Sequence, residues 1–202
     1  LMLDRDDRFF RKLVRDNVSG QLKVAPEHCA DGVLDAMGKP HFDVYEAFRK
    51  KYFALSKEIG KEQYLVPYLM SSHPGSTLDD AIELALYLKK NKINPEQVQD
   101  FYPTPGTAST VMFYTGLDPF TLKEVYVPRT AEEKRMQRAL LQWRRPEMHR
   151  DVVAALNKGL KDKLNTIENP STWPFIVFED ARAMMKSVVR EKIEKFGSAG
   201  RI

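Results

Sequence analysis

The region that decides the fold runs from residue 60 to residue 107 and reads GKEQYLVPYLMSSHPGSTLDDAIELALYLKKNKINPEQVQDFYPTPGT. Residues 64–70 form a near-continuous apolar run of strand length, which is typical of a parallel strand covered on both faces. Ser76 and Asp79 predict the start of an amphipathic helix, since a hydroxyl N-cap and an acidic residue three positions later satisfy free backbone N–H groups. Residues 97–101 are expected to form a second, short strand. The region therefore predicts a strand–helix–strand unit with parallel strands.

Two polar loops, residues 71–75 and 102–107, follow the two strands of this unit. Each contains proline and glycine, which turn the chain sharply. In parallel α/β folds the binding and catalytic groups lie where strands end and loops begin. We therefore expect any site to lie at these two loops.

The sequence before residue 60 continues the same alternation. It predicts a helix over 1–16, a short strand over 21–25, a short helix over 31–37 and a long amphipathic helix from about 43 to 59. The expected buried side of the long helix consists of Val44, Phe48, Phe53, Leu55 and Ile59. This order favours an α/β fold with a parallel sheet or a segment of a (β/α) barrel.

After residue 107 the pattern favours helices. The expected elements are a helical turn or a strand over 108–114, a short strand over 122–127, and helices over about 130–144, 146–160 and 179–196. Thr130 and Glu133 form the pattern of a capping box at the first of these helices. We divide the chain into a barrel segment, residues 1–128, and a mainly helical C-terminal extension, residues 129–202.

Composition limits the class of protein. The chain has 202 residues, 43% of them hydrophobic and 30% charged, as in ordinary globular proteins. No apolar run approaches the roughly 20 residues needed to cross a bilayer, so we expect no membrane contact. The single cysteine excludes an intramolecular disulfide and favours a reducing, cytoplasmic location. The net charge of +4 comes with no nucleic-acid-binding motif, so we do not expect a nucleic acid as partner.

Several residues at the strand ends have side chains suited to ligand binding or proton transfer. Lys23, Glu27 and His28 flank one strand end and are suited to bind an anion, accept ribose hydroxyls or move protons. Taken in isolation, these residues are better explained as a capped strand end with solvated charges. Ser72 and His73 offer a hydroxyl and an imidazole, in a turn that needs proline and glycine anyway. The stiff loop 101–107 suits a ligand-facing segment or a barrel-closing turn. No metal ligands are predicted, because no second histidine or cysteine stands at ligand spacing from His73.

Several longer segments of the sequence resemble one known family. These segments are SGQLKVAPEH (19–28), VLDAMGKP (33–40), GKEQYLVPYLMSSHPG (60–75), PEQVQDFYPTPGTAST (95–110), FYTGLDPFT (113–121), VYVP (125–128) and KRMQRALLQ (134–142). Together they resemble the C-terminal half of the catalytic barrel in the YgiQ-type radical SAM proteins, from about residue 18 to residue 142. Residues 143–202 show no family-like pattern.

The resemblance implies a site for S-adenosylmethionine (SAM). By motif position, the residues expected to contact SAM are Lys23, Glu27, His28, Ser72, His73, Gly75, Phe101, Tyr102 and Thr104. The resemblance implies no catalytic residue and no substrate. In the family, a four-iron four-sulfur cluster cleaves SAM to a 5′-deoxyadenosyl radical, which abstracts hydrogen from the substrate.

The family's CxxxCxxC motif, whose three thiolates hold the cluster, is absent from this chain. The motif belongs earlier in the barrel, so we interpret the chain as a fragment whose partner is the missing N-terminal half. The chain alone is not expected to reduce SAM. The alternatives are a non-catalytic module that binds a nucleotide-like ligand or assists assembly, and an RNA-modifying relative within the wider superfamily.

Overall fold

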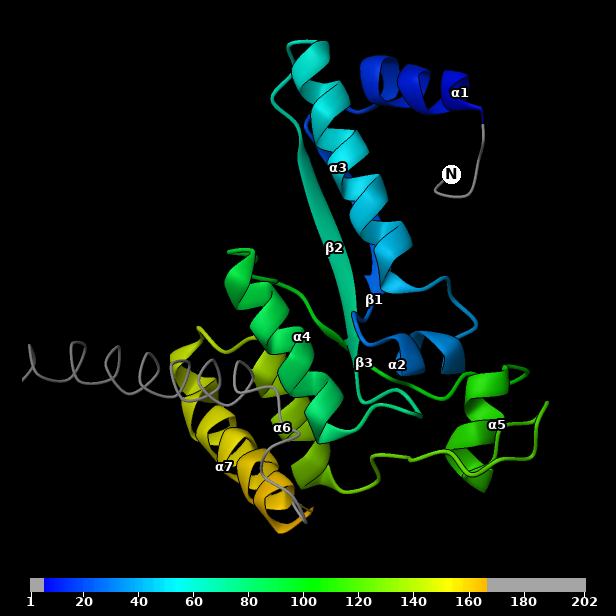
Figure 1. Ribbon diagram of the computed structural model, residues 1–202, viewed down its shortest axis with the longest axis vertical. Coiled ribbons are helices and arrows are strands. Elements are labelled where there is room, and N and C mark those ends of the chain that lie inside the picture. Colours follow the sequence, from blue (N-terminus) through cyan, green and yellow to red (C-terminus); the bar gives the residue numbers. More distant parts are fainter. Residues whose placement is uncertain (1–5, 167–202) are drawn as a thin grey trace, which may run out of the picture.

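The computed structural model describes the backbone of residues 6–166 and the side chains of residues 6–159 (Figure 1). The described part is an α/β structure with a small parallel sheet. Its helices are α1 (Asp7–Lys12), the π-helix η1 (Leu13–Asn17), α2 (Asp31–Ala36), α3 (Phe42–Glu58), α4 (Leu78–Lys90), α5 (Ala108–Thr115), α6 (Ala131–Leu141), the 3-10 helix η2 (Pro146–Met148) and α7 (His149–Thr166). Its strands are β1 (Gln21–Glu27), β2 (Tyr64–Ser71) and β3 (Gln99–Asp100).

The three strands are parallel and follow the order β1-β2-β3, so β2 is central. β1 pairs with β2 along most of its length, whereas β3 joins β2 only at Met70–Gln99 and Ser71–Asp100. The predicted strand–helix–strand unit, β2–α4–β3, is thereby confirmed, with β3 shorter than the predicted range 97–101. The α/β class is confirmed, and the partial barrel stays a prediction.

Helices cover only one face of β1 and β2. Leu22, Val24 and Leu65 pack against the buried side of α3, which lies along the two strands in Figure 1. Side chains alternate between the two faces of a strand, so Lys23, Tyr64 and Tyr68 lie on the opposite face. There Tyr64 is 55% and Tyr68 is 38% exposed. The prediction that β2 is buried on both faces is therefore wrong, because no helix of residues 6–166 packs on this second face. We call it the open face.

A second core lies between α4, α6 and α7, which pack together beside the end of β2 (Figure 1). Leu84, Leu140 and Leu156 are fully buried at its centre. α7 lies close to α4 at Gly159, where an added Cβ would lie only 2.5 Å from Ile82 Cδ1. The helices predicted over 130–144 and 146–160 are confirmed as α6 and as η2 with α7.

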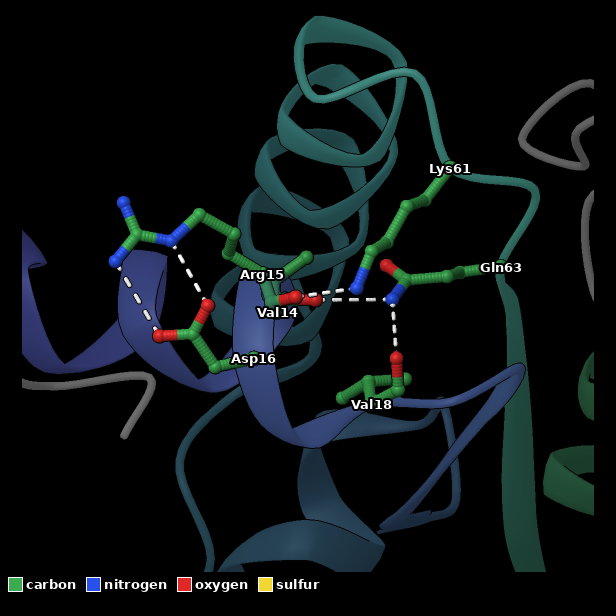
Figure 2. Close-up of polar contacts among 6 residues, drawn as sticks. All are labelled: Val14, Arg15, Asp16, Val18, Lys61 and Gln63. Atoms are coloured by element: carbon green, nitrogen blue, oxygen red, sulfur yellow. Dashed lines mark hydrogen bonds and ion pairs between the residues drawn. The ribbon is translucent and has the colours of Figure 1, made fainter.

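The N-terminal segment is fastened to the start of β2 by one buried side chain. Figure 2 shows Gln63 Nε2 donating hydrogen bonds to the carbonyl oxygens of Val14, at 2.9 Å, and Val18, at 2.7 Å. The Lys61 ammonium group donates to the Arg15 carbonyl beside it. Val14 and Arg15 lie in the last helical turn and Val18 follows it, so their carbonyls lack helical partners, and Gln63 and Lys61 supply the donors.

Several local predictions need correction. Residues 13–17 are π-helical, not a continuation of one α-helix. The buried side of α3 includes Tyr45 and Tyr52, while the predicted Phe53 is 41% exposed. The region 108–114, left open between helix and strand, is α5. The predicted strand over 122–127 is a loop that forms one isolated antiparallel bridge, Leu117–Glu124.

Two further predictions concern a C-terminal helix and contact with a membrane. The helix predicted over 179–196 lies outside residues 6–166. Within the described part, no helix has the length and apolar character that a membrane crossing requires.

Candidate functional site

β1 and β2 end side by side with the same unusual backbone feature. Glu27 closes β1 with a φ of 66°, and Ser72 follows β2 with a φ of 63°. The left-handed conformation costs a residue other than glycine roughly 1–2 kcal/mol and concentrates at ligand and switch sites. Each of these residues is followed by a buried histidine, His28 and His73, which are 1% and 3% exposed. The two strand ends therefore form one local site.

The His73 side chain is held inside the loop that follows β2. Its Nδ1 lies 2.6 Å from the Pro74 carbonyl oxygen and therefore donates, because a carbonyl only accepts. In the neutral ring, Nε2 then accepts from the Ser109 hydroxyl at 2.8 Å. The ring also packs edge-on against Phe101, with 5.0 Å between centroids. Burial lowers the pKa of His73, so the ring is neutral near pH 7.

The His28 side chain caps the start of the chain segment that leads into α2. Its Nδ1 accepts a hydrogen bond from the Ala30 N–H at 3.0 Å. Burial lowers the pKa of His28 to about 4, and the neighbouring His73 adds to the lowering while Asp80 opposes it. The imidazole is consequently neutral in the folded protein.

The Glu27 carboxylate lies at the edge of this site with 18% of its side chain exposed. The Lys39 ammonium lies 3.5 Å from it and donates to the Ala25 carbonyl oxygen at 2.7 Å. The carboxylate is thus held in place by a cation and remains accessible to a ligand. An ionised carboxylate in this position accepts hydrogen bonds from hydroxyl groups.

The end of β2 is joined to β3 through Asp100. The Ser71 hydroxyl donates to Asp100, and Arg138 Nη1 donates to the other carboxylate oxygen at 2.6 Å. The Phe101 N–H donates to the Ser71 carbonyl oxygen at 2.8 Å, which brings the Phe101 ring beside His73. The loop after β3 therefore reaches the same site as the loop after β2.

A buried amide from α6, Gln137, holds the backbone of the loop after β2. Gln137 Oε1 accepts from the Ser72 N–H at 2.9 Å and from the Ser76 hydroxyl at 3.1 Å, and Nε2 donates to the Ser76 carbonyl oxygen at 2.8 Å. The Ser72 hydroxyl itself is buried and has no hydrogen-bond partner within the described structure. Sequence reasoning missed Gln137, although its spacing from Leu140 and Leu141 places it on the apolar side of α6.

Gly75 is needed for the turn that closes this loop. Its φ is 92°, and an added Cβ would lie 3.0 Å from Ala36 Cβ. Its N–H donates to the Tyr126 carbonyl oxygen at 2.7 Å. A glycine therefore allows the loop to lie against α2 and the 116–126 segment.

The nine residues expected to contact SAM divide into two groups. Glu27, His28, Ser72, His73, Gly75 and Phe101 lie at the joined ends of the strands. Lys23 lies apart from them, while Tyr102 and Thr104 lie in the exposed loop that follows Phe101. Lys23 is on the open face with its ammonium 5.9 Å from the centre of the Tyr68 ring, while Tyr102 is 77% exposed and Thr104 is exposed in the 102–107 loop. The roles of all nine as SAM contacts stay predictions.

The residues present fit SAM better than they fit an iron–sulfur cluster. Cys29 is the single cysteine, and burial raises the pKa of its thiol, which disfavours the thiolate that ligates iron. Within the described residues, no group of three or more histidine, cysteine or acidic side chains is placed to hold a metal ion. The free Ser72 hydroxyl, the Glu27 carboxylate and the exposed Tyr102 ring are groups that suit an adenosine-containing ligand.

The fold and the joined strand ends define a parallel α/β protein with a candidate ligand site at the carboxyl edge of its sheet. The chain is 58% identical over 164 residues to a UPF0313 protein of Clostridium perfringens, covering 81% of this chain and 25% of that protein. It is 57% identical over 164 residues to a UPF0313 protein of Clostridium botulinum, of which it covers 26%. The chain therefore belongs to the UPF0313 family and spans about a quarter of the length of these relatives.

A second comparison concerns the later part of the chain. A family model described as a domain of unknown function, DUF3362, matches residues 96–190. Residues 143–190, where no family pattern was expected, thus carry one. The division at residue 128 stays a prediction. No solved structure matches the chain.

Proposed function

We propose that this chain supplies part of the S-adenosylmethionine site of a radical SAM enzyme. The observation that carries the proposal is the pair of strained residues, Glu27 and Ser72, at the ends of adjacent parallel strands. Strain of this kind is kept where surrounding structure holds a binding geometry. The resemblance of the strand-end segments to the YgiQ-type proteins supports the same assignment.

SAM carries a positively charged sulfonium group, and the charges at the strand ends suit such a cation. His28 and His73 are neutral because burial lowers the pKa of each, so neither adds positive charge beside the ligand. The Glu27 carboxylate is placed to accept ribose hydroxyls. The exposed Tyr102 ring offers a face on which adenine can stack. The Ser72 hydroxyl is buried and has no hydrogen-bond partner within the described structure, and we assign it to a polar atom of the ligand.

The cluster of the proposed enzyme would be held by cysteines other than Cys29. With SAM, it supplies radical chemistry: reductive cleavage of SAM followed by hydrogen abstraction from a substrate. The residues of this chain bind and orient SAM and exclude water. Incubated alone with SAM and a strong reductant, the chain is expected to produce no 5′-deoxyadenosine. Formation of 5′-deoxyadenosine by this chain would contradict the proposal that the cluster is held elsewhere.

We also propose that the open face is covered by the rest of the longer protein. The relatives are about four times as long as the matched segment, and exposed Tyr64 and Tyr68 offer an apolar surface. A covered face of this kind would form the interior of a larger barrel.

Substitution of Glu27 tests the proposed site. In the chain joined to the remainder of the Clostridium perfringens relative, Glu27→Ala is expected to weaken SAM binding about 10-fold to 100-fold, because charge-assisted hydrogen bonds are lost. Glu58→Ala is the matched control, since Glu58 pairs with Arg11 at the far end of α3. Calorimetric titration measures both. Unchanged affinity in Glu27→Ala would refute the assignment of Glu27.

A further inference from the structure

The segment matched by the domain of unknown function, residues 96–190, holds the loop after β2 at several points. The contacts come from four different places in that segment: Phe101 N–H to the Ser71 carbonyl, Ser109 to His73, the Tyr126 carbonyl to Gly75 N–H, and Gln137 to Ser72 and Ser76. Each contact falls on the loop and none requires a ligand to be present. The segment therefore acts on the candidate site directly.

Gln137 differs from the other contacts because it is a polar side chain on the apolar side of a helix. It is 1% exposed, and its helical neighbours Met136, Leu140 and Leu141 are buried in the core. Burying an amide is unfavourable unless its donors and acceptors are bonded. All three hydrogen bonds that Gln137 makes go to the loop, at Ser72 and Ser76. Packing α6 against its neighbours does not require an amide at this position.

We infer that Gln137 is a positioning residue that fixes Ser72 in its left-handed conformation and so orients the free Ser72 hydroxyl in the candidate site. The inference gives the segment of unknown function a role, the support of a ligand-binding loop. The part of it that concerns SAM rests on the proposed function. The part that concerns the loop backbone stands without it.

The geometry explains why the amide is needed. The left-handed φ of Ser72 is unfavourable, and its buried N–H needs an acceptor that the strand ladder does not supply. Gln137 Oε1 is that acceptor, at 2.9 Å. Without it the N–H is left buried and unpaired, which favours opening of the loop to water.

The test compares two buried glutamines of the α6 region by hydrogen exchange of the 202-residue chain. Gln137→Met removes the amide while keeping length and apolar character. Gln142→Met is the matched control, because Gln142 is 2% exposed and donates at 3.0 Å to the Glu96 carbonyl oxygen, away from the loop. Gln137→Met is expected to speed exchange across residues 71–76 about 10-fold or more, with exchange in the middle of β2 unchanged. Gln142→Met is expected to leave 71–76 as in the wild type.

A double-mutant cycle separates the amide's bonds from simple packing. Ser76→Ala removes the hydroxyl that donates to Gln137, so its effect on exchange should be smaller in the Gln137→Met background than in the wild type. Unchanged protection of residues 71–76 in Gln137→Met, an equal effect of Gln142→Met, or strict additivity with Ser76→Ala would overturn the inference. If SAM fails to protect residues 71–76 in this chain joined to the remainder of the Clostridium perfringens relative, the proposed function fails. The role of Gln137 in the free chain is still decided by these variants.

Discussion

Two buried glutamines hold the backbone at opposite ends of β2. Gln63 bonds the carbonyls of Val14 and Val18 where the strand begins, and Gln137 bonds Ser72 just beyond its last residue. A side-chain amide carries both donors and an acceptor, so one residue can satisfy irregular backbone that neither helix nor strand pairs. The two glutamines thereby fix the position of β2 at both of its ends.

The buried His28 predicts a loss of stability in acid. Its folded pKa, about 4, lies below the value of 6.5 for a free imidazole, so the unfolded chain binds the proton more readily. The stabilisation is present above about pH 6.5 and is lost as the pH falls toward 4, by about 3 kcal/mol for this residue. His28→Asn keeps an acceptor for Ala30 and is expected to flatten that decline in urea unfolding. A decline of equal slope in both proteins would show that His28 does not titrate as described.

Ser72 predicts a trade-off between stability and binding. Ser72→Gly relieves the left-handed strain and removes a buried hydroxyl without a partner. The greater conformational freedom of glycine in the unfolded chain offsets part of this stabilisation. The free energy of unfolding should therefore rise by about 0.5–1 kcal/mol. SAM affinity should fall in the same variant, because the hydroxyl is gone. A less stable variant would contradict the strain at Ser72, and a variant that binds SAM normally would contradict a ligand role for its hydroxyl.

At the scale of elements, capping and spacing made α4 and α6 predictable. The box predicted at Thr130 and Glu133 is present, with the Glu133 N–H donating to the Thr130 hydroxyl at 3.1 Å. The box predicted at Ser76 and Asp79 is displaced by one residue, to Thr77 and Asp80. The predicted length of β3 was too great, since only Gln99 and Asp100 pair with β2. The buried role of Gln137 was not predictable from α6 alone, because its partners lie 61 and 65 positions away.

The packing of α7 on α4 gives a prediction at this scale. Gly159→Ala places a methyl group 2.5 Å from Ile82 Cδ1, so the end of the buried Ile82 side chain must move, and a net loss of about 1 kcal/mol is expected after the better helix propensity of alanine is included. Gly32→Ala, in α2, is the control, since no atom lies within 4 Å of the added Cβ. There we expect a neutral change or a gain of up to about 1 kcal/mol. Thermal unfolding of the two variants measures the difference, and equal effects would contradict the close α4–α7 contact.

At the scale of the whole molecule, one covered face and one open face define the arrangement. The sequence predicted that the strands are parallel, because strands that alternate with helices favour a parallel sheet. It did not predict the open face, since an apolar run such as 64–70 is the same whether its second cover lies in this segment or in another part of a longer protein. The chain spans about a quarter of the length of these relatives, and the proposed cover of Tyr64 and Tyr68 would come from the remaining part of a protein of that length.

We propose above all that the joined strand ends bind S-adenosylmethionine. The most direct measurement is a hydrogen-exchange map, with and without SAM, of this chain joined to the remainder of the Clostridium perfringens relative. We expect SAM to slow exchange at residues 26–30, 71–76 and 101–107, and to leave residues 92–97, at the opposite end of the strands, unchanged. Saturating SAM that leaves these three loops unprotected, or protects residues 92–97 instead, would contradict the claim.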